Sequence, residues 1–302
     1  MACLFAARLS AAGFPVVMLA SWPAGLDALA RDGVTLIEAD GRRRSYAVQV
    51  ARQANECVGV QFALVLVKSW QTGHAARQLA HCLPADGLAL TLQNGMGNRE
   101  TLARYLGAAR VALGVTTAGV TLIAPAVARL AGDGRQTALP LTLGVHARIK
   151  PLADRLSAAG FAIESSSDVT GLVWGKLVIN AAINPLSALL RVPNGELLTR
   201  PAARALLVSA AREAAGVAVA RGVTLPYPDA AIAAETVARN TASNRSSMLQ
   251  DVERGAPTEV DAINGAIVRA AEQAGVPTPI HRTLWQLVKA LAGAKQTAQE
   301  KP

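Results

Sequence analysis

Three polar side chains interrupt an apolar stretch at residues 174–185, "WGKLVINAAINP". Lys176, Asn180 and Asn184 are each four residues from the next, and on an α-helix this spacing turns by only ~40° per step, so all three share one face. A lysine ammonium can donate a proton or stabilise a developing negative charge, and asparagine amides can hydrogen-bond an oxygen-rich ligand. The residues alone leave two interpretations open, which are one wall of an active-site cleft and a polar stripe exposed to solvent.

Two further groups of polar residues follow apolar, strand-like segments. "LQNGMGNRE" at 92–100 contains Asn94 and two glycines that let the backbone turn tightly beside a ligand, and "VKSWQTG" at 67–73 contains Lys68 and Gln71. In doubly wound α/β sheets, ligands bind beyond the carboxyl ends of the strands. Each group is also explained by an ordinary solvated loop between a strand and a helix.

The segment "SNRSSMLQDVERGAPTEVDAING" at 243–265 is polar and contains Asn244, Ser247 and Glu259. Thr258 and Glu259 fit the first turn of an apolar-periodic helix, where a carboxylate is favourable. Helix capping alone can therefore explain Glu259. It does not explain the serine–asparagine cluster upstream, which leaves a ligand-binding role open.

The first half of the chain alternates between short apolar strands and helices. We expect helices at 2–12, 25–32, 74–82, 99–106 and 149–159, and strands at 14–20, 34–38, 46–50, 62–67, 88–92, 110–115 and 161–164. This alternation predicts a parallel sheet covered by helices on both faces.

Residues 119–145 interrupt this alternation. Here "VTLIAPAVARLAG" and "LPLTLGV" are expected to be antiparallel strands joined by a turn at Gly132–Asp133–Gly134. Residues 165–168 fit a linker and helix N-cap. Beyond them we expect helices at 169–183, 195–221, 228–240, 258–274 and 279–293. The sequence thus predicts an α/β domain at 1–167 and an all-α domain at 168–302.

Composition narrows the classes of function. The net charge is +9, but aromatic residues make up only 4% and the densest basic run is 41–44, which argues against a nucleic-acid-binding protein. Scattered surface arginine and attraction of an anionic ligand both stay open. Three cysteines without a CxxC pair, and four histidines without a metal-ligand pattern, predict a reducing compartment and no metal site. The uncharged run at 9–26 is broken by glycine and proline, so we expect a cytoplasmic protein without a membrane span or signal peptide.

Four motifs together resemble the ketopantoate reductase (2-dehydropantoate 2-reductase) family, from residue 2 to about residue 293. They are "VKSWQT", "QNGMGNRE", "GKLVINAAINPLSALLRVPNGEL" and "SSMLQDVERGAPTEVDAING", in the order of the family. The resemblance implies an N-terminal Rossmann domain, a helical C-terminal domain, NADPH as cofactor and a cleft between the domains.

The same resemblance implies a role for each matching residue. Lys176 matches the general acid, and Glu259 matches the acidic residue beside the lysine and the cofactor. The implied substrate-binding residues are Asn180, Asn184, Asn194, Asn244 and Ser247, and the implied cofactor-binding residues are Lys68, Gln71, Asn94, Gly119 and Glu259.

The chain departs from the family pattern at its beginning. A dinucleotide-binding Rossmann domain starts with a strand and a Gly-x-Gly-x-x-Gly turn, whereas "MACLFAARLSAAGFPVVML" starts in the first helix, with Ala2 at the place of the last glycine. Either the true start lies upstream of Met1, or the chain is short and we expect it to be poorly stable and to bind cofactor weakly. After the second strand, where family members often place an arginine for the 2′-phosphate, this chain has Ser21 and no acidic residue for a ribose diol. Ser21 can hydrogen-bond a phosphate, so NADPH stays favoured over NADH.

We therefore expect NADPH-dependent reduction of 2-dehydropantoate to (R)-pantoate on the route to coenzyme A. Lys176 would protonate the alkoxide that forms at C2. Two alternatives stay open, a related reductase of another small 2-keto acid and a catalytically silent relative. The expected partner is a small-molecule 2-keto acid, with no nucleic acid and no membrane, and the helical half can form a homodimer.

Overall fold

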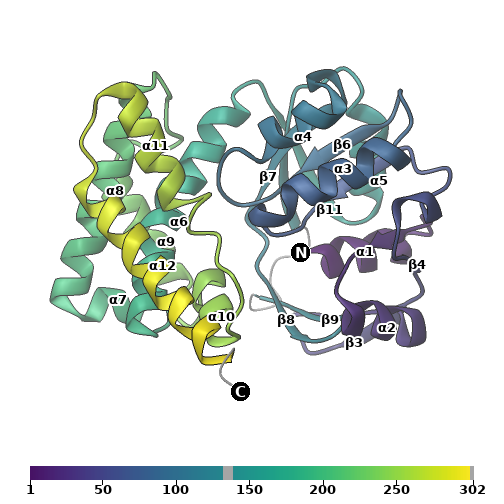
Figure 1. The fold of residues 1–302 in the computed structure, drawn as a ribbon, viewed down its shortest axis with the longest axis horizontal. Helices are drawn as coiled ribbons and strands as arrows, with labels where there is room; N and C mark the ends of the chain where they lie inside the picture. The colour runs from purple at the N-terminus through teal and green to yellow at the C-terminus, as the bar shows by residue number, and fades with distance from the viewer. Residues whose placement is uncertain (132–138, 300–302) are drawn as a thin grey trace. The chain divides into compact units, whose positions relative to one another are not determined.

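A computed structural model of the protein describes residues 1–131 and 139–299, with residues 292–299 described by their backbone alone (Figure 1). The chain divides into two compact units. Unit 1 comprises residues 1–93 and 98–169, and unit 2 comprises residues 94–97 and the chain from Thr170 onward. Unit 1 combines parallel strands with helices and unit 2 is helical. This confirms the expected fold class, an α/β Rossmann-like domain followed by an all-α domain.

The described strands of unit 1 form three sheets. The largest has the order β11-β10-β7-β6-β5, and its strands are β5 (Phe62–Val65), β6 (Leu88–Thr91), β7 (Val111–Thr116), β10 (Leu139–Gly144) and β11 (Phe161–Ser166). The second has the order β3-β2-β9-β8, with β2 (Val34–Ile37), β3 (Arg43–Tyr46), β8 (Val120–Ala124) and β9 (Val127–Leu130). A third pairs β1 (Val17–Leu19) with β4 (Gln49–Ala51) in parallel. Among the described strands, β1 and β5 each pair on one side only.

Apolar side chains cover both faces of the largest sheet. On β6, Leu88 and Leu90 pack into one core cluster, and Ala89 packs into another on the opposite face. The first cluster receives Phe5 of α1 (Ala2–Ala11), whose ring stacks on Phe161 with centroids 4.4 Å apart. The second is completed by α3 (Thr72–Cys82) and α4 (Asn98–Leu106). The remaining α-helices of the unit are α2 (Pro23–Asp32) and α5 (Lys150–Ala158), and its short 3-10 helices are η1 (Ala54–Glu56), η2 (Ser69–Gln71) and η3 (Ala108–Arg110).

The expected pairing within residues 119–145 is wrong. The first stretch forms a hairpin by itself, because β8 pairs antiparallel with β9 across a turn in which Ala126 has φ 60°. The second stretch is β10, which belongs to the largest sheet and pairs antiparallel with β7 and parallel with β11. An alternating apolar pattern shows that a strand has a buried face, but it does not identify the neighbouring strand. The expected turn at 132–134 lies outside the described residues.

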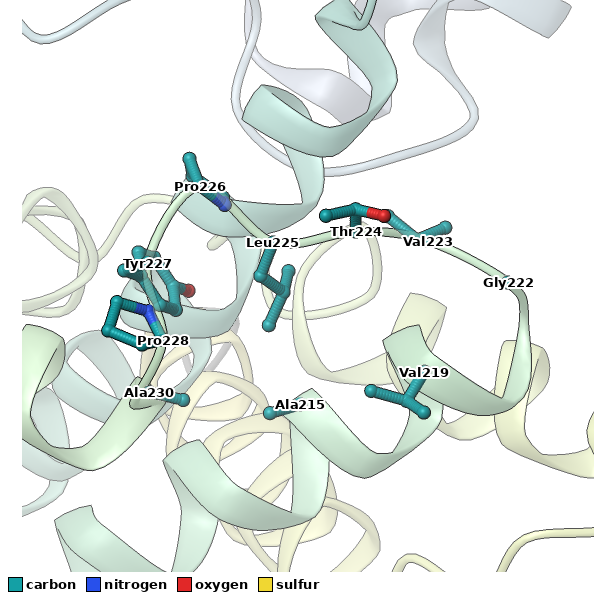
Figure 2. Close-up of a pocket in the computed structure, with 10 residues that line it drawn as sticks. All are labelled: Ala215, Val219, Gly222, Val223, Thr224, Leu225, Pro226, Tyr227, Pro228 and Ala230. Carbon is teal, nitrogen blue, oxygen red and sulfur yellow. The ribbon is translucent and has the colours of Figure 1, made fainter.

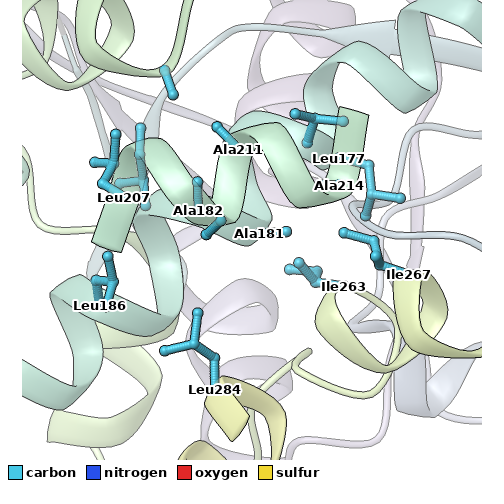
Figure 3. Packing of buried hydrophobic residues seen from close by; sticks show 14 of the residues in the cluster. Leu177, Ala181, Ala182, Leu186, Leu207, Ala211, Ala214, Ile263, Ile267 and Leu284 are labelled. Carbon is cyan, nitrogen blue, oxygen red and sulfur yellow. The ribbon is translucent and has the colours of Figure 1, made fainter. Parts of the chain in front are cut away.

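Unit 2 is built around α6 (Val169–Leu190). The other helices are α7 (Glu196–Thr199), α8 (Pro201–Ala220), α9 (Ala230–Asn240), α10 (Ser247–Glu253), α11 (Asn264–Ala274) and α12 (Pro279–Gln299). Figure 3 shows Ala181 and Ala182 of α6 beside Ala211 and Ala214 of α8 in the core, and all four are fully buried.

Several expected helix boundaries in unit 2 are wrong, including that of the helix expected at 279–293, which continues to Gln299. The helix expected at 169–183 continues through Pro185 to Leu190, and the helix expected at 195–221 is split, because Pro201 begins the new helix α8. The helix expected at 258–274 begins only at Asn264, and α10 was not expected. By length and composition α6 could cross a membrane, but 67% of its most apolar window is buried inside unit 2, as is usual for a core helix.

Candidate active site

Lys176 lies in the second turn of α6, where its side chain is half-buried. Burial lowers the pKa of its ammonium group from 10.5 to about 8, because the charged form loses hydration. The negative charge of Glu259 acts in the opposite direction and raises this pKa. The result is a lysine that is protonated at neutral pH and can release its proton more readily than an exposed lysine.

Glu259 is 5% exposed and lies in the turn between α10 and α11. Its backbone carbonyl accepts hydrogen bonds from the amides of Ala262 and Ile263, both at 3.0 Å. The interpretation of Glu259 as a first-turn capping residue is wrong, because α11 starts five residues later at Asn264. Its burial beside Lys176 instead makes it the counter-charge of the lysine.

Residues 94–97 follow a strand of unit 1 but belong to the compact body of unit 2. The amide of Met96 donates to the carbonyl of Ala262 at 2.9 Å, so this loop lies against the turn that carries Glu259. Gly95 has φ 81°, and a Cβ there would lie 2.5 Å from the oxygen of Ala262. Only glycine permits both this conformation and this approach. The loop thereby brings the half-buried Asn94 to the same region as Glu259.

Asn180 and Asn184 follow Lys176 at successive turns of α6. Asn180 is half-buried and Asn184 is 6% exposed. These low exposures contradict the interpretation as a solvent-exposed stripe. A buried amide loses its hydration, so each of these side chains needs another hydrogen-bonding partner.

The predicted residues 194, 244 and 247 lie around α10 and the end of α6. The backbone amide of Asn194 donates to the carbonyl of Asn244 at 3.0 Å, and its Nδ2 donates to Oγ1 of Thr241 at 2.9 Å. Among the described residues, no partner is found for the buried Oδ1 of Asn194. Asn244 is exposed. Ser247 is the first residue of α10, after Ser246, whose hydroxyl caps the helix by accepting from the amide of Leu249 at 3.1 Å.

In unit 1, Lys68 precedes the short helix η2, which follows β5, and Gln71 is the last residue of η2; the amide of Gln71 donates to the carbonyl of Lys68 at 2.8 Å. The pKa of the Met1 amino group is lowered first by burial, and the positive charge of Lys68 lowers it further. Lys68 therefore lies close to the N-terminal end of α1. Gly119 precedes β8 in the second sheet, where it is exposed and its carbonyl accepts from Ala131 at 2.8 Å.

Sequence reasoning missed a residue that connects the two loops of unit 1. Nε2 of Gln93 donates to the carbonyl of Val67 at 2.9 Å and lies 2.8 Å from Oγ1 of Thr72. Oγ1 of Thr72 in turn donates to Oδ1 of Asn98 at 2.9 Å. Gln93 thus holds the ends of β5 and β6 together. Its position directly after a buried strand, beside Asn94, was the available signal.

An open pocket of about 800 Å³ lies elsewhere in unit 2, between α8 and the loop 222–228 (Figure 2). Its lining is mostly apolar and contains none of the predicted site residues. It approaches α6 through Tyr227, whose hydroxyl donates to the carbonyl of Gly175 at 2.9 Å. Within the residues described, no group of three or more His, Cys, Asp or Glu side chains could hold a metal ion.

Comparisons with known proteins agree across both units. Residues 1–141 match the family model described as Ketopantoate reductase PanE/ApbA, and residues 168–292 match the one described as Ketopantoate reductase PanE/ApbA C terminal. A 2-dehydropantoate 2-reductase of Halobacterium salinarum is 35% identical over 91% of this chain and 90% of that protein. One from Archaeoglobus fulgidus is 40% identical over 74% of each chain. The crystal structure of a PanE/ApbA family ketopantoate reductase from Ralstonia eutropha superposes with a TM-score of 0.89, at 31% identity, covering 97% of this chain and 96% of that one.

Proposed function

Because the chain belongs to the ketopantoate reductase family, we propose that it reduces 2-dehydropantoate to (R)-pantoate with NADPH, a step of pantothenate and coenzyme A biosynthesis. The observation that carries the proposal is the ammonium group of Lys176, half-buried, with its pKa lowered to about 8, beside Glu259. A proton donor with a pKa near the working pH is what this reduction needs.

Lys176 acts on the carbonyl oxygen at C2 of the substrate. NADPH, when bound, supplies the hydride, and the carbonyl oxygen then develops negative charge. The ammonium group stabilises that charge and delivers the proton that completes the alcohol. Glu259 keeps the lysine protonated near neutral pH by raising its pKa against the effect of burial.

Amide and hydroxyl groups of unit 2 bind the substrate. They are Asn180, Asn184, Asn194, Asn244 and Ser247. The clearest support comes from Asn194, whose buried Oδ1 lacks a partner within the described residues. An unmatched buried acceptor costs roughly 1–3 kcal/mol, and the hydroxyl group of pantoate or its precursor can satisfy it by donating a hydrogen bond. Neutral partners also bind an organic acid without introducing further negative charge.

The residues of unit 1 fit the anionic end of NADPH. The first turn of α1 has no side-chain cap and no acidic residue, and Lys68 contributes positive charge there. Free amides at a helix N-terminus and a nearby cation are the usual partners of a phosphate. Gln71, Asn94 and Gly119 are proposed as further contacts, and Glu259 as a contact near the reacting end.

Several further expectations from the sequence stay predictions. Cofactor binding by residues 1–167, substrate binding by residues 168–302, a cytoplasmic location and a homodimer all stay predictions. The same holds for the absence of a metal, a nucleic acid or a membrane among the partners.

Steady-state kinetics test the proposal. Purified protein is mixed with 2-dehydropantoate and NADPH, and oxidation of the cofactor is followed by its absorbance, with NADH and a panel of small 2-keto acids as comparisons. We expect the highest kcat/KM with 2-dehydropantoate and NADPH. Preference for another 2-keto acid would reassign the substrate, and no turnover with any pair would refute the reductase activity.

A further inference from the structure

Pro185 interrupts the hydrogen-bond ladder of α6, and this missing hydrogen bond is called the defect below. Pro185 has no amide hydrogen, so the carbonyl four residues earlier, that of Ala181, loses its partner within the helix. Ala181 is fully buried, and water cannot readily supply the missing donor. Helix α6 nevertheless continues to Leu190. Another group must therefore compensate for the proline.

The compensating donor is Asn264, the first residue of α11. Its Nδ2 donates to the carbonyl of Ala181 at 3.0 Å, and Asn264 is fully buried. The orientation of the amide follows from chemistry, because a backbone carbonyl only accepts and therefore requires the NH₂ group of the asparagine. In this orientation the buried Oδ1 of Asn264 has no hydrogen-bond partner among the described residues, which costs free energy.

The second hydrogen of the same NH₂ group is donated to the ring of His281 on α12. Nδ1 of His281 lies 3.0 Å from Nδ2 of Asn264, and Nε2 lies 2.9 Å from the carbonyl of Ala210 on α8. Because that carbonyl can only accept, Nε2 carries the hydrogen and Nδ1 accepts from Asn264. The backbone amide of His281 is fixed in turn by the carboxylate of Glu213, at 2.8 Å. Asn264 is thus oriented by groups on two further helices.

The repaired carbonyl lies in the helical turn between Asn180 and Asn184, although its residue is turned ~100° away from the face that the two asparagines share. Ala181 directly follows Asn180, and Asn184 directly precedes Pro185. Lys176 lies more than one turn before the defect, in the part of the helix where the hydrogen-bond ladder is uninterrupted. The direction of α6 at the defect therefore sets where Asn180 and Asn184 point relative to Lys176.

We infer that Asn264 is a positioning residue of the reductase: by replacing the hydrogen bond that Pro185 removes, it holds Asn180 and Asn184 in register with Lys176. This inference rests on the proposed function. It predicts that the loss of Asn264 weakens substrate binding more than proton transfer, because the asparagines lie at the defect and the lysine does not.

The test is a double-mutant cycle between Asn264→Ala and Pro185→Ala. Alanine at 185 restores the amide that donates to the carbonyl of Ala181, so it should rescue what Asn264→Ala removes. Asn264→Ala also removes the contact to His281, but it does so with either proline or alanine at position 185, so this contribution cancels in the cycle. As matched control, Pro201→Ala changes a proline at the first position of α8, where no carbonyl is left unpaired by it.

We expect Asn264→Ala to lower the urea midpoint and to raise KM for 2-dehydropantoate about tenfold, with a smaller change in kcat. Pro185→Ala, added to Asn264→Ala, should reverse at least half of the fall in the urea midpoint and half of the rise in KM. Pro201→Ala should reverse neither change. No rescue of the midpoint by Pro185→Ala would overturn the inference. A rescued midpoint with KM unaffected throughout would also overturn it, because Asn264 would then be only structural. Absence of turnover in the unmodified protein would refute the proposed function instead, and the unfolding cycle would then still decide whether Asn264 replaces the hydrogen bond that Pro185 removes.

Discussion

Two polar pairs involve α6, and they differ in charge. Lys176 is paired with Glu259, while Asn264, which contacts the helix through Ala181, is paired with His281. Burial lowers the pKa of both bases, to about 8 for Lys176 and to about 4 for His281. At neutral pH the lysine therefore carries a proton that it can donate, and the histidine is neutral. The same desolvation acts on the proposed proton donor in one pair and on a structural hydrogen-bond acceptor in the other.

The largest effect should come from the charged pair. Lys176→Met keeps the aliphatic stem but removes the proton donor, and we expect kcat to fall by ~10²–10⁴. The free energy of unfolding at pH 7 should change less than the removal of either charge alone would suggest, because the variant removes the cost of a buried ammonium but leaves the buried Glu259 without its counter-charge. Steady-state kinetics and urea unfolding measure the two quantities. Wild-type turnover in this variant would remove Lys176 from its role.

The sequence predicted the charged pair better than the neutral one. The spacing of Lys176, Asn180 and Asn184 placed them on one face, and the family motifs suggested Glu259 as their neighbour. Asn264 could not be found in this way, because its partner is a backbone carbonyl 83 residues earlier in the chain. A proline inside an apolar stretch predicts an unpaired carbonyl, but not the residue that will satisfy it.

A similar limit applies to the fold. Apolar periodicity located most strands and helices, since it reports which face of an element is buried. It did not place β10 next to β7, and it extended α11 over the turn that carries Glu259. Strand order and helix starts depend on contacts between distant parts of the chain, which local patterns do not contain.

The neutral pair should give the protein an acid-sensitive stability. Because the pKa of His281 is lowered by burial from 6.5 to about 4, the unfolded chain binds a proton first as the pH falls. Stability from this group is complete above pH 6.5 and is lost as the pH falls towards 4, at roughly 1.4 kcal/mol per pH unit and about 3 kcal/mol in total.

Urea unfolding between pH 7 and pH 4 measures this loss. His281→Gln should flatten the dependence on pH, and His74→Gln, which changes an exposed histidine, should leave it as in the wild type. Equal slopes for all three proteins would show that His281 is not the group responsible.

A smaller effect should come from the buried acceptor near α10. Asn194→Ala removes the unmatched Oδ1 together with the hydrogen bond to Thr241. We expect KM for 2-dehydropantoate to rise several-fold to about tenfold, as for one lost hydrogen bond, with kcat little changed. Thr241→Val is the matched control, because it breaks the same bond and keeps Oδ1. An equal rise of KM in both variants would mean that the bond to Thr241, rather than Oδ1, accounts for the effect.

The smallest effect on turnover is expected from Glu259→Gln, which makes the charged pair resemble the neutral one. Glu259→Gln keeps the shape of the side chain and removes its charge, so the pKa of Lys176 should fall below 8, since Glu259 raises it. A general acid works only while it is protonated, and the basic limb of the kcat profile should therefore move to lower pH. At pH 6 the lysine stays protonated and turnover should be close to that of the wild type, whereas at pH 8 it should be several-fold lower. A loss of the same size at both pH values would show that Glu259 contributes by contact with the reactants and not through the charge of Lys176, and the contrast between the two pairs would then not be one of electrostatics.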